Sequence, residues 1–356
     1  MKFVVACGGT GGHSFPGLAV AEELVRRGHE VVVWTSGRDI ESSVFRGWKG
    51  ATFTTGARQM SLRNGFAIMR SVLRCRAELR RFRPDALLAM GSYSSLPPVV
   101  AARLAGVSVV LHEANTVPGR AVDFLSKLAR VVAISFDETS RYLPNVRTVR
   151  TGLPVRAGIS EGKRFDFIPK DSFVVFVTGG SQGAHAVNML ASEALTLMKT
   201  ELDAREGGAK RPLYVIHQTG VNDEGVVMGA YARVSLPSRV QAFESEMADA
   251  FASADVVLAR AGASTCFELA ACGRPALLLP LPTAMRNHQH FNAAAFVTAG
   301  AADEGDQAKL SPHQLCRYLI DKYDRPDRLA AMSDKMKSLA VSGAAARVAD
   351  LVESMK

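Results

Sequence analysis

The chain's 356 residues suffice for two domains of ordinary size or one large one, and an apolar fraction of 47% with a charged fraction of 22% excludes a disordered, collagen-like or low-complexity polymer. It has no run of 18 or more apolar residues and no signal-peptide pattern, so we expect neither a membrane-spanning helix nor a secretory leader. The net charge of +9 is uneven: residues 1–160 carry 22 Lys and Arg against 11 Asp and Glu, so the excess lies in the first half and indicates an anionic partner or surface.

Short apolar strands alternate with amphipathic helices in the first half of the chain. This alternation predicts a parallel sheet covered by helices on both faces. Helical patterns between the strands include Pro16–Arg27 and Leu96–Ala105. The expected strands are Phe3–Cys7, Val31–Trp34, Ala86–Ala89, Val107–Leu111, Val131–Ile134 and Arg147–Val149.

A second, similar series follows the segment Thr151–Asp171, whose glycines and prolines we interpret as an interdomain linker. We therefore predict an α/β protein with domains over residues 1–158 and 169–339. A last helix, within about 340–356, is able to pack on either domain, including back on the first. The strands expected in the second domain are Phe173–Thr178, Leu213–His217, Val240–Ala242, Val256–Leu258 and Ala276–Leu279.

Each half opens with a strand, a glycine-rich turn and a helix. The turns are Gly8-Gly9-Thr10-Gly11-Gly12-His13 and Gly179-Gly180-Ser181-Gln182-Gly183-Ala184. Glycine lets backbone N–H groups approach a phosphate at the positive end of the following helix. A tight turn without a ligand is the alternative for one loop, but two loops at equivalent points weaken it. We expect the ligand in a cleft between the carboxyl ends of the two sets of strands.

The loops differ from two common phosphate-binding motifs. A dinucleotide fingerprint requires a third glycine where Ser14 stands and an acidic residue at the end of the second strand, where Trp34-Thr35-Ser36 follows. Both are missing, which disfavours NAD. The Gly-x-x-x-x-Gly-Lys-Ser/Thr motif of a P-loop ATPase does not occur either. A nucleotide-sugar diphosphate is the better candidate ligand.

Further motifs follow the first loop in order along nearly the whole chain. They are Phe15-Pro16-Gly17-Leu18-Ala19-Val20-Ala21, Met90-Gly91-Ser92-Tyr93, His112-Glu113-Ala114-Asn115, Gly152-Leu153-Pro154-Val155-Arg156, Gly180-Ser181-Gln182-Gly183-Ala184, His217-Gln218-Thr219-Gly220, Met247 to Asp255, Arg260-Ala261-Gly262-Ala263-Ser264-Thr265 with Glu268, and His288-Gln289 with Asn292-Ala293. Each is weak alone, but the ordered set resembles the MurG family, the N-acetylglucosaminyltransferases that convert lipid I to lipid II in bacterial cell-wall synthesis.

This resemblance implies a GT-B glycosyltransferase fold, in which two Rossmann-like domains face each other across a cleft. It implies an inverting transfer of N-acetylglucosamine from UDP-N-acetylglucosamine, held by the C-terminal domain, to the 4-hydroxyl of the muramic acid sugar of lipid I, held by the N-terminal domain. The chain differs from the usual family pattern at Ser92, Ala114 and Leu153, where the family has Gly, Gln and Asn.

The implied reaction needs a base for the attacking hydroxyl and stabilisation of the leaving diphosphate. His13 is the predicted base because imidazole titrates near neutral pH, and the alternative is a histidine that orients the loop or caps a helix. Backbone N–H groups of both glycine loops, with the hydroxyls of Thr10 and Ser181, are expected to stabilise the diphosphate. Arg156 would clamp it, the alternative being a solvated hinge arginine.

The resemblance also assigns the rest of the donor and acceptor residues. Glu268 is expected to accept the ribose hydroxyls, although by pattern alone it is a first-turn acid beside the helix dipole. Gln289 and Asn292 share a helical face and would read the sugar hydroxyls. The other predicted donor contacts are Gly11, Gly12, Asn115, Ala263, Ser264, Thr265 and Glu244, the last through its backbone at the uracil. The predicted acceptor side consists of Ser92, Tyr93, Glu113 and Asn115.

No Asp-x-Asp pair occurs, and the histidines show no metal-ligand spacing with acids or cysteines. We therefore predict neither a metal nor another cofactor. The five scattered cysteines include no Cys-x-x-Cys pair and indicate reduced thiols of a cytosolic protein.

Residues 58–83 form a basic stretch with one acid, Glu78. Its apolar residues at helical spacing fit an interfacial helix on anionic lipid, and the alternative is a core-facing helix with a solvated basic face. A nucleic-acid patch is disfavoured because only Phe66 and Phe82 could stack on bases. The polyprenyl tail of the implied acceptor favours a peripheral protein on the cytoplasmic face of the bacterial inner membrane. The arginines are Arg58, Arg63, Arg70, Arg74, Arg76, Arg80, Arg81 and Arg83.

Two rival functions stay open. One is a GT-B enzyme that uses another sugar or lipid. The other is a nucleotide-sugar sensor without turnover, which would keep Glu268 and Gln289 but would not need His13.

Overall fold

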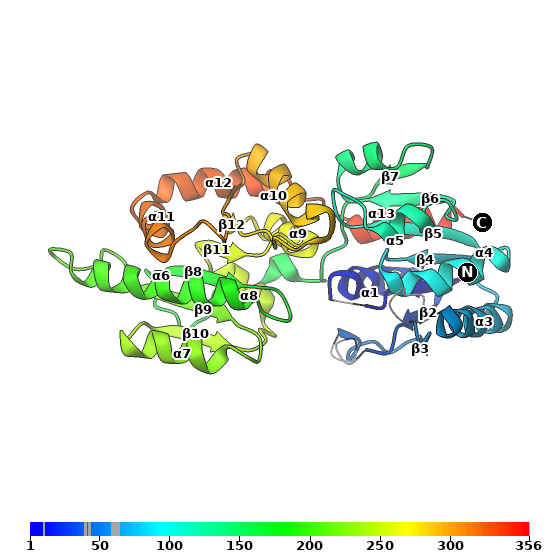
Figure 1. Cartoon of the computed structure of the whole chain (residues 1–356), viewed down its shortest axis with the longest axis horizontal. Coiled ribbons are helices and arrows are strands. Elements are labelled where there is room, and N and C mark those ends of the chain that lie inside the picture. The colour runs from blue at the N-terminus through cyan, green and yellow to red at the C-terminus, as the bar shows by residue number, and fades with distance from the viewer. Residues whose placement is uncertain (10, 39–40, 42–43, 58–64, 356) are drawn as a thin grey trace. The chain divides into compact units, whose positions relative to one another are not determined.

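The computed structural model describes residues 1–9, 11–38, 41, 44–57 and 65–355. These residues form two compact units, residues 1–157 with 341–356 and residues 158–340. Each unit is a parallel β-sheet with helices on both faces (Figure 1), as the alternating pattern predicts. Within the described residues, no helix is both long enough and apolar enough to cross a bilayer.

The sheet of the first unit has the strand order β3-β2-β1-β4-β5-β6-β7. Its strands are β1 (Lys2–Ala6), β2 (Glu30–Thr35), β3 (Ala51–Thr54), β4 (Ala86–Ala89), β5 (Ser108–Glu113), β6 (Val131–Ile134) and β7 (Thr148–Arg150). The sequence does not predict β3, because this edge strand is mostly exposed and lacks an apolar run.

Helices cover both faces of this sheet and bury separate cores. They are α1 (Gly11–Arg26), α3 (Gly65–Phe82), α4 (Leu96–Leu104), α5 (Arg120–Leu125) and α13 (Ala344–Glu353), with 3-10 turns η2 (Tyr93–Ser95) and η3 (Asp137–Tyr142). One face packs on α1 and α13, and the opposite face packs on α3, α4 and α5. The pattern predicts a start for the first helix at Pro16, because proline favours the first turn. The helix instead starts at Gly11, which places His13 in its first turn.

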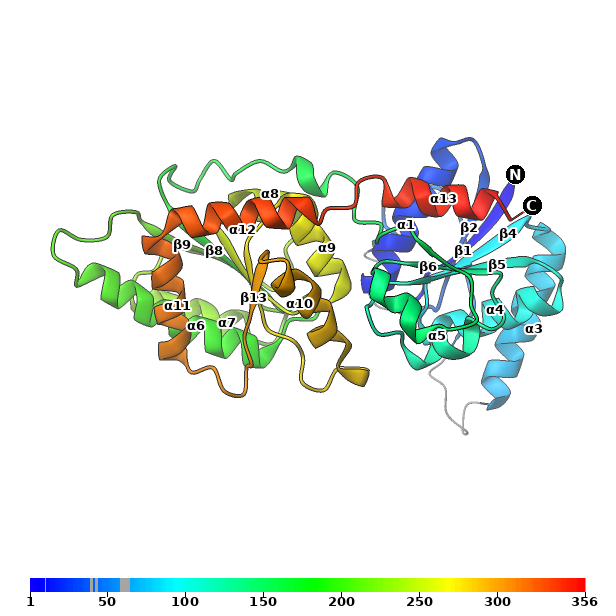
Figure 2. The ribbon, with the colours of Figure 1, turned by 90° about the horizontal axis from the view of Figure 1, so that it is seen from above.

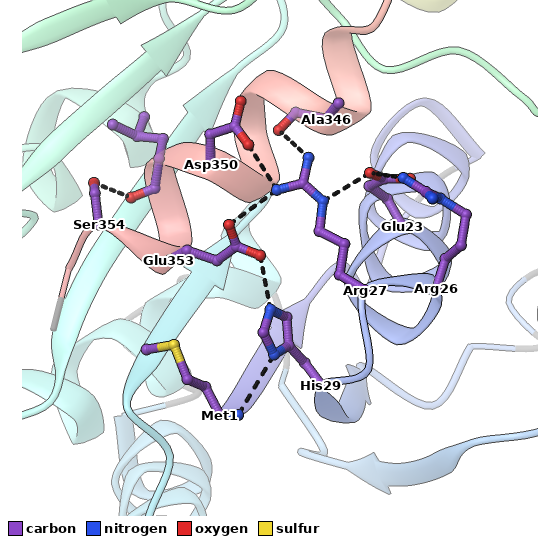
Figure 3. Close-up of polar contacts among 10 residues, drawn as sticks. Met1, Glu23, Arg26, Arg27, His29, Ala346, Asp350, Glu353 and Ser354 are labelled. Carbon is purple, nitrogen blue, oxygen red and sulfur yellow. Dashed lines mark hydrogen bonds and ion pairs between the residues drawn. The ribbon is translucent and has the colours of Figure 1, made fainter.

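The helix α13 returns to the first unit after the chain has formed the second, and Figure 2 shows it beside α1. A network of ion pairs joins the two (Figure 3). Arg27 Nη1 lies 2.6 Å from Asp350 Oδ1 and 2.9 Å from Glu353 Oε2. His29 Nε2 lies 2.7 Å from Glu353 Oε1. The helix therefore belongs to the first unit through both its apolar face and its charges.

The sheet of the second unit has the strand order β10-β9-β8-β11-β12-β13. Its strands are β8 (Phe173–Thr178), β9 (Leu213–Gln218), β10 (Ser238–Gln241), β11 (Val256–Ala259), β12 (Ala276–Leu278) and β13 (Ala302–Glu304). The sequence does not predict β13, a three-residue edge strand with two acids. Residues 158–171 of the predicted linker belong to this unit, and Phe165 and Ile168 are buried there.

The helices of the second unit also form two layers around their sheet. They are α6 (His185–Asp203), α7 (Glu224–Arg233), α8 (Met247–Ser253), α9 (Ala263–Cys272), α10 (His288–Thr298), α11 (Pro312–Asp324) and α12 (Pro326–Ser338), with 3-10 turns η4 (Ile159–Glu161) and η5 (Met285–Asn287). One core contains residues of α6, α7 and α11. On the other face, α9 contacts α8, α10 and α12.

Candidate active site

In each unit a glycine-rich loop lies where the order of the strands reverses. In the first unit β1 pairs with β2 on one side and β4 on the other, so the loops after β1 and β4 flank this switch point. In the second unit β8 pairs with β9 and β11, and the loops after β8 and β11 take the equivalent places. Doubly wound folds bind ligands at such points, so the fold places both predicted loops where ligands are expected.

His13 is half-buried in the first turn of α1, and its ring contacts the loop after β4. Its Nδ1 lies 2.8 Å from the carbonyl oxygen of Met90. A carbonyl only accepts hydrogen bonds, so Nδ1 carries the proton and the basic lone pair is on Nε2. This tautomer suits the predicted role of proton acceptor.

The first glycine loop is held by other parts of the same unit. The N–H of Gly9 donates to Glu41 Oε1 at 2.6 Å, so this N–H group is engaged within the protein. The carbonyl oxygen of Gly8 accepts from Ser92 Oγ at 2.8 Å. Of the predicted donor contacts, Gly11 and Gly12 are the first two residues of α1, and Thr10 lies outside the described residues.

The predicted acceptor residues lie on the loops after β4 and β5. Tyr93 is half-buried in η2, and Ser92 caps this turn by accepting from Ser94 N at 3.2 Å. Glu113, at the end of β5, is buried and accepts from Asn115 N at 2.8 Å and Asn115 Nδ2 at 3.0 Å. It also accepts from Gly119 N at 3.1 Å. Glu113 therefore shapes the loop that presents Asn115.

Burial shifts the pKa values of two side chains at the end of β5, His112 and Glu113, in directions that favour their neutral forms. It raises the pKa of Glu113 to about 7 despite the hydrogen bonds that favour the carboxylate. It lowers the pKa of His112 to about 4, with His13 adding a smaller repulsion. His112 is therefore a neutral ring at neutral pH, and its Nε2 lies 3.2 Å from the carbonyl oxygen of Gly152.

We expect Glu113→Gln to change the pH dependence of stability. The native state binds the Glu113 proton more tightly than the unfolded chain, whose pKa is near 4.5, so this group makes the native protein less stable as pH rises from about 4.5 to 7. The free energy of unfolding of wild type, minus that of the variant, should therefore fall by at most about 3 kcal/mol between pH 4.5 and 7 and stay constant above pH 7.

The fluorescence of Trp34 and Trp48, both in the first unit, follows urea unfolding at each pH. Glu138→Gln, at an exposed position of the same unit, is the control. If the difference in free energy of unfolding between wild type and Glu113→Gln does not vary with pH, the prediction is wrong.

Arg156 lies in the last stretch of the first unit and is half-buried. Its guanidinium carbon lies 4.4 Å from the centre of the Phe15 ring, in the first helix. This stacking holds the side chain beside α1. Its role at the diphosphate stays a prediction.

The second glycine loop is supported by the end of β9. Gln218 Nε2 donates to the carbonyl oxygen of Gly180 at 2.8 Å, and Asn188 Nδ2 donates to that of Thr219 at 2.7 Å. A Cβ on Gly183 would lie 2.0 Å from the Thr219 carbonyl oxygen. Ser181 is exposed on the loop, four residues before the start of α6. These contacts hold the loop at the N-terminus of α6, and helix N-termini are common binding sites for phosphate groups.

The loop after β11 leads into a second helix N-terminus. Gly262 precedes α9, whose first turn contains the half-buried Ser264 and Thr265 after the buried Ala263. Glu268 is the sixth residue of α9 and is buried, so its interpretation as a first-turn acid is wrong.

The remaining predicted donor residues have partners within the second unit. Gln289 Oε1 accepts from Leu281 N at 2.8 Å. Asn292 is fully buried and donates to the carbonyl oxygen of Ala261 at 3.2 Å, so it supports the loop after β11. Glu244 is buried and pairs with Arg239, whose Nε lies 2.8 Å from Glu244 Oε2. The contact of the Glu244 backbone with uracil stays a prediction.

Sequence reasoning missed two residues that shape these loops. Gln218 lies within a recognised motif, yet the motif gives it no role; its position at the end of a strand next to the loop strand is the signal. Glu41 lies six residues beyond β2, and only the fold brings it back to Gly9. Among the described residues, no group of three or more His, Cys, Asp or Glu side chains gathers as metal ligands would.

Comparisons with known proteins agree with this architecture. Residues 3–134 match the N-terminal domain of glycosyltransferase family 28, and residues 174–350 match its C-terminal domain. A crystal structure of Acinetobacter baumannii MurG superposes with a TM-score of 0.78 at 28% identity and covers 99% of both chains. The fold and its two loop sites therefore define a glycosyltransferase of the GT-B fold.

Two bacterial relatives indicate to which family of glycosyltransferases the chain belongs. Each is named UDP-N-acetylglucosamine--N-acetylmuramyl-(pentapeptide) pyrophosphoryl-undecaprenol N-acetylglucosamine transferase. The protein of Syntrophotalea carbinolica is 38% identical, and that of Geobacter sulfurreducens is 36% identical. Both alignments cover 98% of this chain and 97% of the relative. The chain belongs to this family of transferases, the MurG family.

Proposed function

We propose that this protein transfers N-acetylglucosamine from UDP-N-acetylglucosamine to the 4-hydroxyl of the muramic acid sugar of lipid I, undecaprenyl-pyrophosphoryl-MurNAc-pentapeptide, to form lipid II. The observation that carries the proposal is the match over nearly the whole chain to relatives, 32–38% identical, that bear this activity in their names. The position of His13 in the first turn of α1 and the glycine loop before α6 support it.

In the proposed reaction the acceptor hydroxyl oxygen attacks the anomeric carbon of the donor sugar. The bond from that carbon to the diphosphate breaks, the anomeric centre inverts, and UDP leaves with the bonding electron pair. His13 Nε2 takes the hydroxyl proton, because Nδ1 is held in its protonated form by Met90.

The leaving diphosphate gains negative charge, which the N-termini of α6 and α9 would stabilise. Ser181 precedes the first of these helices, and Ser264 and Thr265 lie in the first turn of the second. We assign Thr10 and Arg156 to the diphosphate and Glu268 to the ribose. Gln289 and Asn292 belong to the sugar subsite, where the buried Asn292 acts by holding the loop at Ala261.

The test is incubation of the full chain with UDP-N-acetylglucosamine and a short-chain lipid I analogue, with UDP release and the disaccharide product measured. We expect both products only when the acceptor is present. UDP-glucose as donor tests the rival enzyme with another sugar. Tight binding of UDP-N-acetylglucosamine without any product would instead favour the sensor without turnover.

We further propose that α3 binds the anionic cytoplasmic surface of the membrane that holds the acceptor's lipid tail. Its Val72, Cys75 and Leu79 pack in the core of the first unit, so one side of the helix faces the core, as the alternative interpretation expects. The other side exposes Phe66 and Leu73, by 85% and 57% respectively. Arg70, Arg74, Arg80 and Arg81 are exposed around them, whereas Arg58, Arg63, Met60 and Leu62 of the predicted basic stretch lie outside the described residues.

We expect the protein to pellet with vesicles that contain anionic lipid and to be released by salt. Removing two exposed charges with Arg70→Gln and Arg80→Gln should weaken this partitioning about 30-fold, since each basic residue near such a surface contributes about 1 kcal/mol. Arg233→Gln, at an exposed position of the second unit, is the matched control. Equal recovery with neutral vesicles would count against the proposal.

A further inference from the structure

We propose that Glu41 is a positioning residue for catalysis. Its carboxylate accepts hydrogen bonds from the first glycine loop, in the way that a bound anion would, and thereby fixes the position of His13. The inference rests on the proposed function, because His13 is the base in that reaction. It concerns a side chain to which neither the motifs nor the relatives' names assign a role.

Glu41 is 97% buried, and its carboxylate is surrounded by backbone N–H groups from two loops. Oε1 accepts from Gly9 N at 2.6 Å, after β1. Oε2 accepts from Ser36 N at 2.9 Å and Gly37 N at 2.8 Å, after β2, and more weakly from Arg38 N at 3.3 Å. The hydroxyl of Ser36 also donates to Oε1.

The charge of this carboxylate is balanced by dipoles and not by a cation. In the described part of the chain, no Lys or Arg forms an ion pair with Glu41. Successive backbone N–H groups that converge on one point form an anion-binding concavity, of the kind that holds phosphate in other glycine loops. Here the protein supplies the anion itself, so this concavity is filled.

The loop is fixed on its other side as well. The carbonyl oxygen of Gly8 accepts hydrogen bonds from Ser92 and Ser94. A Cβ on Gly8 would lie 2.4 Å from Ser36 N and 3.1 Å from Glu41 Oε1, so the backbone passes in close contact with both residues. Gly8 and Gly9 thus have little room to move between the carboxylate and the two hydroxyls.

This fixed loop leads directly into the helix that carries the base. Gly9 is two residues before the start of α1, and His13 is the third residue of that helix. If Glu41 released Gly9, the N-terminal turn of α1 would lose its anchor at one end, while the His13 ring would keep its hydrogen bond to Met90. A base displaced by about 1 Å accepts a proton far less effectively, so we expect kcat to decrease.

The test is Glu41→Ala with added carboxylate. We expect kcat of this variant to fall at least about tenfold while KM for UDP-N-acetylglucosamine stays within about twofold. Formate should restore kcat in a saturable way, because it fits the vacated concavity and accepts from the same N–H groups, whereas chloride at equal ionic strength should not. Glu138→Ala, at an exposed position of the same unit, should behave like wild type with and without formate.

Thermal unfolding supplies a readout that does not depend on activity. Formate should raise the melting temperature of Glu41→Ala and leave wild type unchanged. Glu41→Gln keeps one acceptor oxygen and fills the space, so it should lose turnover without rescue by formate; it also serves if the alanine variant does not fold. The inference is overturned if either variant turns over at the wild-type rate, or if the folded alanine variant loses activity that formate does not restore. Failure of wild type to transfer the sugar would instead overturn the proposed function.

Discussion

Replacing His13 with alanine should lower kcat by about 10²- to 10⁴-fold, the range expected when a general base is removed. The Nδ1 bond to Met90 fixes the tautomer that leaves the basic lone pair on Nε2, and alanine offers no group to take the hydroxyl proton. Binding of UDP should change by less than about twofold, because His13 is not among the residues assigned to the diphosphate and the helix N-termini that are assigned to it belong to the second unit.

This prediction separates catalysis from binding. Steady-state kinetics with the lipid I analogue gives kcat, and calorimetric titration with UDP gives the dissociation constant. His313→Ala, at an exposed position in α11, is the control for loss of an imidazole. Turnover close to that of wild type in His13→Ala would remove the base assignment and favour a histidine that only organises the loop.

Replacing Gly183 with alanine should lower kcat/KM for UDP-N-acetylglucosamine by about 100-fold or more. The new Cβ would lie 2.0 Å from the Thr219 carbonyl oxygen, and Gly183 has φ +76°, which is unfavourable for alanine. The loop must therefore move by about 1 Å against the end of β9, and such a displacement in a substrate-positioning group costs about two orders of magnitude.

Gly180→Ala is the matched control within the same loop. Gly180 has φ +89°, but a Cβ there has no atom within 4 Å. It should suffer only the conformational cost of about 1–2 kcal/mol, which lowers the melting temperature by a few degrees. If both variants lose kcat/KM to the same extent, the contact with Thr219 does not set the loop, and the backbone conformation alone accounts for the effect.

Most of the fold is predictable from the sequence because buried parallel strands are continuous apolar runs. Phe173–Thr178 is such a run, and its predicted bounds are those of β8. The edge strands β3 and β13 are not predicted, because they are short, partly exposed and lack an apolar run. Their conformation depends on hydrogen bonds to a neighbouring strand. The start of α1 also differs, because a glycine-rich first turn has low helix propensity and is set by tertiary contacts.

The site is predictable where it depends on local geometry. A glycine loop between a strand and a helix must lie at the carboxyl edge of the sheet, so the sequence predicts correctly that Ser181 precedes its helix, whereas His13, expected on the loop, lies in the first turn of α1. Contacts between distant segments are not encoded locally. Glu41 and Gly9 are 32 residues apart, and Asn292 and Ala261 are 31 apart, so only the folded chain pairs them.

The return of α13 has a consequence for how the protein is made. Val348 and Val352 complete the core that also contains Val20 and Leu24. On the ribosome, residues 1–157 emerge before the whole second unit, whereas α13 emerges only after it. Until α13 has been synthesised, the nascent first unit therefore exposes an uncovered apolar stripe, a surface on which chaperones act and aggregates grow.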